Sequence, residues 1–114
     1  MLPPANRLRK EKEIKRALAG RSGCKVGLLA CKTAKNGLKT ARFCFIVSKR
    51  ISNKAVDRNK LKRRLRAAVM AQLSRVNPGV DCVLVAYPGL ETRGYGDLTL
   101  AVEKILNKSG VLKS

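Results

Sequence analysis

The residues of this sequence with the clearest chemistry lie between Asp57 and Arg66. Six of the nine residues from 58 to 66 are arginine or lysine. If the segment is helical, like charges meet one turn apart, as at Lys62 and Arg66 or Lys60 and Arg64, and their repulsion opposes the helix. A phosphate-rich partner would offset this repulsion, because guanidinium and ammonium groups donate hydrogen bonds to phosphate oxygens. The segment therefore predicts a phosphate-binding surface.

Catalysis by the protein itself is poorly supported by its residue types. The sequence has no histidine, which is the commonest general acid and base in enzymes. Its seven acidic residues are scattered, and the closest pair, Glu11 and Glu13, points to different faces of a helix. A two-metal nuclease needs clustered carboxylates instead. We therefore expect no catalytic residue in this chain.

The cysteines favour free thiols in a core over a metal site. No two of them have the C-x-x-C spacing, and each lies within or beside an apolar run, where a thiol behaves as a small apolar group. They are Cys24, Cys31, Cys44 and Cys82. We expect neither a disulfide nor a metal ligand among them.

The charge of the whole chain points to a polyanionic partner. The net charge is +19, and residues 1–66 hold 21 of the 26 basic residues against three acids. Such a field attracts nucleic acid or an anionic membrane surface. A membrane-surface helix needs large apolar residues opposite the charge, whereas the apolar stripe here passes into alanines. No apolar stretch is long enough to span a bilayer, and no signal-peptide core follows Met1, so we expect a cytoplasmic nucleic-acid-binding protein.

The apolar pattern predicts one domain over residues 1–114. It begins with a basic extended arm at residues 1–9, where Pro3 and Pro4 disfavour a helix. The expected order is helix, strand, strand, helix, strand, helix, which makes an α+β sandwich with helices packed on a short sheet. Asn36-Gly37 predicts a hairpin turn. The predicted helices span 11–19, a segment from 53–57 to about 76, and 96–107; the predicted strands span 25–31, 41–48 and 81–87.

The predicted faces of these elements specify the core. A helical stripe of Leu61, Leu65, Ala68, Gln72 and Val76 can dock on the sheet, and Asn53 or Asp57 can cap the helix. The third helix buries Leu98, Val102, Ile105 and Leu106. Strand 41–48 places Phe43, Phe45 and Val47 on one face and Arg42, Cys44 and Ile46 on the other. The continuous apolar run of strand 81–87 is typical of a strand that is buried on both faces.

Several segments together resemble the bacterial ribonuclease P protein family. Val47-Ser48-Lys49-Arg50, then Asn53, then Arg58-Asn59-Lys60-Leu61-Lys62-Arg63 is similar to the family's V-S-K-K loop and R-N-R-x-K-R helix. Asn6-Arg7-Leu8 is similar to its N-terminal arm, and Asp81–Ala86 to its D-[YIV]-[VI]-[VI]-[VI]-A strand. Tyr95, a leucine-rich helix and Lys108 are similar to its C-terminal segment. The resemblance covers nearly the whole chain.

The resemblance implies a fold and a function. The implied fold has an unusual left-handed β-α-β crossover. By this resemblance the protein is expected to be the non-catalytic subunit of ribonuclease P, an endoribonuclease whose catalytic RNA, with magnesium that the RNA chiefly binds, removes the 5′ leader of precursor tRNA. The implied partners are the catalytic RNA and the leader, with no obligate protein partner and no membrane. RNA-binding residues implied by the resemblance, together with the arm, are Arg58, Asn59, Lys60, Lys62, Arg63, Arg66, Ser48, Lys49 and Arg7.

A leader cleft is implied between the first helix and the sheet, lined by Ile14, Leu18 and Ile46. Three positions depart from the family pattern: Lys60 replaces the usual arginine, Ile14 and Leu18 replace aromatics, and Ala30 replaces a frequent tyrosine. The cleft should therefore hold the leader more by backbone charge and apolar contact than by stacking. A small basic ribosomal protein is the alternative function. It explains the charge but not the joint V-S-K and R-N-x-x-K-R segments.

Overall fold

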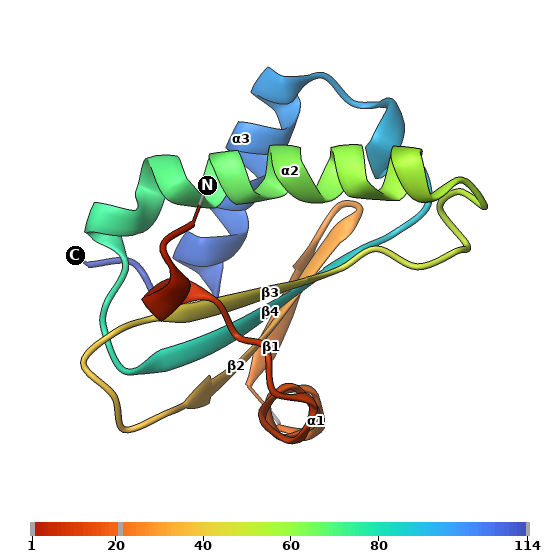
Figure 1. Ribbon diagram of the computed structural model, residues 1–114. Helices are drawn as coiled ribbons and strands as arrows, with labels where there is room; N and C mark the ends of the chain where they lie inside the picture. The colour runs from red at the N-terminus through yellow and green to blue at the C-terminus, as the bar shows by residue number, and fades with distance from the viewer. Residues whose placement is uncertain (1, 21, 114) are drawn as a thin grey trace.

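The strands of the computed structural model form one mixed four-stranded sheet in the order β1-β2-β4-β3 (Figure 1). The structure describes residues 2–20 and 22–113. β1 pairs antiparallel with β2, β2 antiparallel with β4, and β3 parallel with β4. The elements are α1 (Glu11–Ala19), β1 (Gly23–Val26), β2 (Leu29–Lys35), β3 (Arg42–Ile46), α2 (Ala55–Gln72), β4 (Val80–Ala86) and α3 (Tyr95–Lys108).

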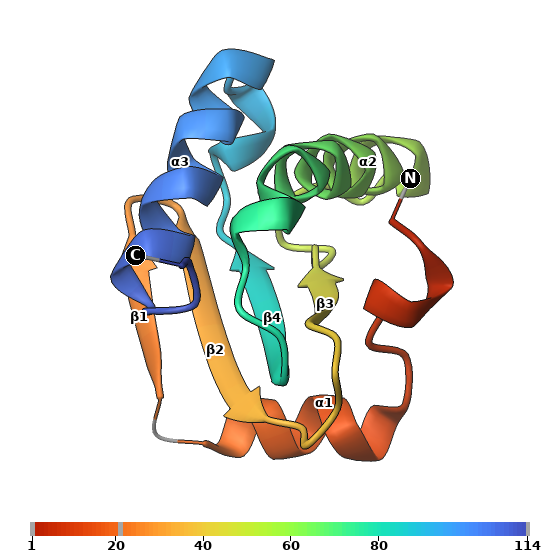
Figure 2. The same ribbon diagram turned by 90° about the vertical axis from the view of Figure 1, so that its left-hand side faces the viewer.

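Helices cover both faces of this sheet. Figures 1 and 2 show α2 and α3 together on one face and α1 crossing the other face. The larger core lies under α2 and α3, where Phe43 and Phe45 of β3 meet Leu61 and Leu65 of α2. A smaller apolar cluster under α1 is built around Leu8, Ala17 and Val83. This arrangement confirms an α/β sandwich with helices packed on a short sheet.

The crossover from β3 through α2 to β4 is left-handed. In Figure 1, β3 and β4 run from left to right, so in Figure 2, which is viewed from that left-hand side, they run upward and away from the viewer, with α2 above the sheet and β4 to the left of β3. A right-handed crossover would place the second strand to the right, and nearly all known parallel crossovers are of that kind. The hand that the resemblance implied is therefore present in the structure.

The predicted single strand at 25–31 is wrong, because this segment turns back on itself. β1 and β2 are joined by a two-residue turn at Gly27-Leu28, with Val26 opposite Leu29. Gly27 has φ of +57°, which suits glycine at the first central position of a tight hairpin. The apolar residues around Gly27 gave no other turn signal, so the element order has one strand more than predicted.

The predicted hairpin at Asn36-Gly37 is also wrong. This turn joins β2 to β3, which are not neighbours, because β4 is inserted between them. Gly37 does have a positive φ, of +70°, and Asn36 accepts a hydrogen bond from the backbone N–H of Leu38, 2.7 Å away. The local turn chemistry was thus correct, but it serves a loop between separated strands.

The N-terminal arm is less extended than predicted. Pro4–Asn6 form a 3-10 turn, in which proline fits the first position. The arm then lies beside β3, where the Leu8 N–H donates to the Phe43 carbonyl at 2.9 Å. The side chain of Asn6 donates to the Ala41 carbonyl at 2.8 Å. Leu2 and Leu8 are buried, so the arm is part of the fold.

The central elements match their predicted faces. β4 is buried on both faces as expected, and in α3 Leu98, Val102, Ile105 and Leu106 are all fully buried. α2 ends earlier than predicted, at Gln72, and a 3-10 turn covers Leu73–Arg75, so Val76 is buried outside the helix.

Within the described residues, no helix is both long and apolar enough to cross a membrane.

Candidate nucleic-acid interface

The basic helix α2 has one buried stripe and a broad polar surface. Leu61, Leu65, Ala68 and Gln72 are buried as predicted, together with Val69. Since these side chains pack toward the sheet and α3, the basic side chains take up the rest of the helix surface. Of the predicted RNA-binding residues of this helix, Asn59, Lys60 and Arg63 are exposed, while Arg58, Lys62 and Arg66 are half-buried.

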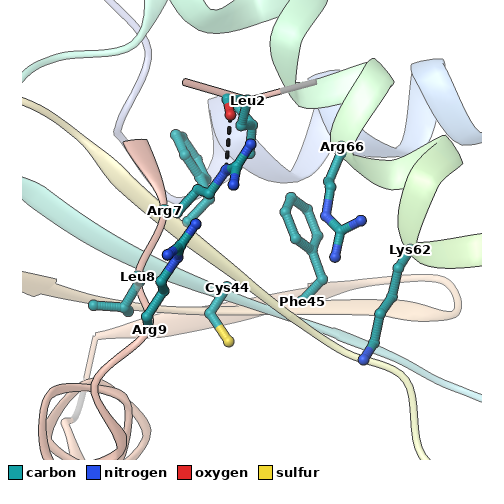
Figure 3. A pocket seen from close by; sticks show the side chains of 9 residues that line it. Leu2, Arg7, Leu8, Arg9, Cys44, Phe45, Lys62 and Arg66 are labelled. Atoms are coloured by element: carbon teal, nitrogen blue, oxygen red, sulfur yellow. Dashed lines mark hydrogen bonds between the residues drawn. The ribbon is translucent and has the colours of Figure 1, made fainter. Parts of the chain in front are cut away.

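A groove of about 280 Å³ runs between the arm and α2. Figure 3 shows Arg7 and Arg9 of the arm on one side of the groove and Lys62 and Arg66 of α2 on the other. The remaining lining residues are Leu2, Leu8, Phe43, Cys44 and Phe45. None of these nine described lining residues is acidic. Four cations on two walls with an apolar floor suit a strand of nucleic acid, whose phosphates are paired while its bases contact apolar side chains.

The opposite flank of α2 carries a different charge pattern. A second groove, of about 330 Å³, contains Lys60 and Arg64 but also the carboxylates of Asp57 and Glu91. These acids weaken the local positive potential, because opposite charges within a few ångströms offset each other. The arm-side groove is therefore the more favourable surface for phosphates.

The loop before α2 is held in place by Arg58. A guanidinium N–H of Arg58 donates to the Ser52 carbonyl at 2.9 Å. The Ser52 hydroxyl donates to Asp57 at 3.0 Å and accepts from the Lys54 N–H at 3.2 Å. Arg58 thus fixes the end of the loop whose exposed residues include Ser48 and Lys49. Its predicted contact with RNA stays a prediction.

The predicted caps of this helix are wrong. Neither Asn53 nor Asp57 caps it; Lys54 occupies the cap position and makes no side-chain capping bond. Ser52, one residue before Asn53, takes over the local hydrogen bonding, because its hydroxyl can both accept and donate.

The predicted cleft residues do lie together, on the sheet face that α1 covers. Ile14 and Leu18 of α1 and Ile46 of β3 all pack in the cluster around Leu8 and Ala17, and each is half-buried. They do not line the arm-side groove. The two places adjoin, however, because Leu8 and Cys44 belong to both. A ligand could thus extend from α2 around the edge of β3 toward α1.

Sequence reasoning did not predict that Arg9, Cys44 and Phe45 share a site with Lys62. Alternation along β3 indicates only which face each side chain takes, and Cys44 and Phe45 point to opposite faces. β3 is an edge strand of the sheet, and the arm pairs with it only at the isolated bridge between Arg7 and Phe43. The groove wraps around this edge, so side chains from both faces of β3 line it. The basic character of residues 7–10 was the one available signal.

All four cysteines are free thiols, as expected. Cys31 and Cys82 are buried, and Cys24 and Cys44 are half-buried. Burial raises the pKa of the Cys44 thiol, and the nearby charges of Lys62 and Arg66 lower it by less. Cys44 therefore faces the groove as a neutral, weakly polar group. In residues 2–20 and 22–113, no group of three or more cysteine or acidic side chains is placed to hold a metal ion.

Known proteins similar to this chain share one description. A family model described as Ribonuclease P matches residues 2–110. The ribonuclease P protein component of Roseiflexus castenholzii is 33% identical over 110 residues, which cover 96% of this chain and 89% of that protein. The protein of the same description from Gluconacetobacter diazotrophicus is 37% identical over 114 residues and 97% of each chain.

Two solved structures share the fold. A Staphylococcus aureus RNase P protein mutant with defective mRNA degradation activity matches with a TM-score of 0.87 at 22% identity, over 95% of this chain and 91% of that chain. The RNase P protein from Thermotoga maritima matches with a TM-score of 0.81 at 21% identity, over 90% of this chain and 96% of that chain. At these identities the likeness establishes the fold alone.

Proposed function

Since this chain belongs to the ribonuclease P protein family, we propose that it binds the catalytic RNA of ribonuclease P through α2 and the arm-side groove. Members of this family are subunits of the endoribonuclease holoenzyme that processes tRNA, and this chain is one of them. The observation that carries the proposed RNA-binding surface is the groove with Arg7 and Arg9 on one wall and Lys62 and Arg66 on the other. The ribosomal-protein alternative is set aside, because the family match covers residues 2–110.

In this proposal the chemical step belongs to the RNA. Several carboxylates of the protein already serve local structure: Glu13 and Asp81 accept hydrogen bonds from Arg42, and Glu91 accepts from the Gly89 N–H. Carboxylates engaged in this way are poorly suited to hold a pair of catalytic metal ions. The magnesium ions, which would stabilise charge during phosphodiester cleavage, would then be bound chiefly by RNA. A cytoplasmic location and independence from other proteins remain predictions.

The protein without RNA should therefore not cleave precursor tRNA. Purified protein that has been treated with ribonuclease and then freed of it would be incubated with labelled precursor tRNA and magnesium. We expect no mature 5′ end above background, and full cleavage once the catalytic RNA is added. Magnesium-dependent cleavage by the RNA-free protein would contradict the proposed division of labour.

We further propose that the 5′ leader runs along the α1 side of the sheet, beginning where that side adjoins the arm-side groove. The support is the continuity of the two places through Leu8 and Cys44. Beyond them lie the half-buried side chains of Ile14, Leu18 and Ile46, which can take part in apolar contact with bases. Mature tRNA has no leader, so this path would distinguish substrate from product.

Ile14→Phe should strengthen binding of precursor tRNA with a long leader. Ile14 is half-buried, so a larger ring has room toward solvent and can stack on a base. Stacking of this kind contributes about 1–3 kcal/mol per base, and we expect the gain in binding free energy to lie near the lower end of this range. The affinity for long-leader and for leaderless tRNA would be measured with holoenzyme that contains either the wild-type protein or Ile14→Phe.

Leu100→Phe is the matched control, because Leu100 is 56% exposed on α3, away from the proposed path. It should change neither affinity. If Ile14→Phe instead lowers the melting temperature without any leader-dependent gain, Ile14 is a core residue that phenylalanine overpacks, at a cost of roughly 1–3 kcal/mol. The leader path would then be wrongly placed.

A further inference from the structure

The helix α1 has little apolar surface with which to hold its place. It has nine residues, and of these only Ala17 is fully buried, while Ile14 and Leu18 are half-buried. A helix this short is marginal by itself, and tertiary contacts normally stabilise it. Because the buried apolar area is small here, contacts of another kind must contribute to fixing α1 on the sheet.

Arg42 of β3 supplies such a contact. Its Nε and Nη2 atoms donate to the two carboxylate oxygens of Asp81, each at 2.8 Å. The same guanidinium donates through Nη1 and Nη2 to the two oxygens of Glu13 on α1, at 3.3 Å and 2.9 Å. One planar group therefore joins the sheet to the helix through two carboxylates, a geometry that lysine cannot reproduce.

The sheet end of this bridge is a buried carboxylate with several partners. Asp81 lies on the central strand β4, directly opposite Arg42 in the parallel register, and its side chain is fully buried. It also accepts a hydrogen bond from the Asn36 side chain at 2.8 Å and lies 3.5 Å from the guanidinium of Arg16 on α1. The hydrogen bonds that Arg42 donates to Asp81, and then those to Glu13, raise the pKa of Arg42 above its ordinary value, so this arginine stays charged.

We propose that Arg42 is a positioning residue for the leader path: by holding Glu13 it fixes α1 and the Ile14 and Leu18 side chains at a set distance from the sheet. This inference rests on the proposed leader path along α1. Glu13 immediately precedes Ile14 and lies just over one turn before Leu18, so fixing Glu13 fixes the side of α1 that would face the leader. Arg42 itself acts through α1 and needs no contact with RNA.

Glu13→Gln tests the bridge without exposing Asp81 to the loss of its partner. Glutamine keeps the size of the side chain but accepts only a neutral hydrogen bond from Arg42. Glu11→Gln is the matched control, because Glu11 lies on the same helix and forms an ion pair with exposed Lys15, at 3.1 Å. Both variants change the net charge equally, so a difference between them measures the effect of the contact between Arg42 and Glu13.

The two readouts are hydrogen exchange of the α1 amides in the free protein and the affinity ratio of the holoenzyme for long-leader over leaderless tRNA. We expect Glu13→Gln to speed α1 exchange and to lower the ratio by about two- to five-fold, the size expected for a partly exposed ion pair. Glu11→Gln should leave both unchanged, and affinity for the catalytic RNA should be the same in all three proteins.

Arg42→Lys provides a second line of evidence, because lysine can hold only one of the two carboxylates at a time. Its effect on the ratio should not add to that of Glu13→Gln in the double variant, since both remove the same contact. Equal behaviour of Glu13→Gln and Glu11→Gln, or faster α1 exchange with an unchanged ratio, would overturn the role of Arg42. A wild-type protein with no preference for the leader would instead refute the proposed leader path itself.

Discussion

Raising the salt concentration from about 50 to 200 mM should weaken binding of this protein to the catalytic RNA by about a thousand-fold or more. The groove contributes Arg7, Arg9, Lys62 and Arg66, and exposed cations such as Lys60, Arg63 and Lys49 lie on α2 and the preceding loop. Six or more phosphate contacts release enough condensed counterions to produce a loss of this size. Kd would be measured across a salt series and plotted as log Kd against log salt concentration.

Single substitutions make the salt experiment specific. Arg63→Gln should make the salt dependence shallower, by about 0.7–0.9 in slope, because one phosphate contact is lost. Lys104→Gln removes an exposed cation of α3 that lies outside the proposed interface, and it should leave the slope unchanged. A nearly flat salt dependence of the wild-type protein, or equal effects of the two substitutions, would refute a phosphate-binding surface on α2.

Arg42→Met should lower the free energy of unfolding by about 3–5 kcal/mol, the usual cost of removing one partner of a buried ion pair. The side chain of Asp81 is fully buried, and Arg42 is only 15% exposed and bonds both of its oxygens. Methionine fills much of the same volume, so the missing charge and hydrogen bonds would dominate the loss. Urea unfolding, followed by circular dichroism, measures the change.

Two further variants separate this pair from ordinary surface charges. Asp81→Asn combined with Arg42→Met should be more stable than Arg42→Met alone, because the double variant no longer holds the buried negative charge that Arg42 compensated. Arg75→Met breaks an ion pair with Glu103 that is 3.8 Å long and about half exposed on both sides, so it should cost no more than about 1 kcal/mol. Similar losses of unfolding free energy for Arg42→Met and Arg75→Met would contradict a large contribution of the Arg42–Asp81 pair to stability.

The sequence alone predicted the elements whose pattern is long and regular. The burial of Leu98, Val102, Ile105 and Leu106 in α3 follows from helical spacing. The continuous apolar run of β4 specifies a strand covered on both faces. The spacing of Leu61, Leu65 and Ala68 specifies a helix with one buried stripe, and the basic residues between 58 and 66 make up the rest of its surface. The linked V-S-K and R-N-x-x-K-R segments indicated the family that the comparisons then showed.

Pairing between distant segments could not be predicted from the sequence. Whether β4 joins β2 and β3 or lies beside one of them depends on packing across the whole sheet, and the local turn signal at Asn36-Gly37 is compatible with either. The hairpin at Gly27 was missed because its flanking residues are apolar in both strands, so no change of pattern marked the turn.

The binding groove and the bridge through Arg42 were likewise determined by the tertiary structure. Arg9 and Lys62 are far apart in the sequence, and they share a groove because the arm pairs with β3 while α2 crosses above it. In the sequence, nothing distinguishes Arg42 from the other basic residues. In the structure, the parallel register places it opposite Asp81, and the packing of α1 on the sheet brings Glu13 into contact with it. Composition specifies how much charge the chain carries, whereas the fold decides which charges face RNA and which are used to hold the fold together.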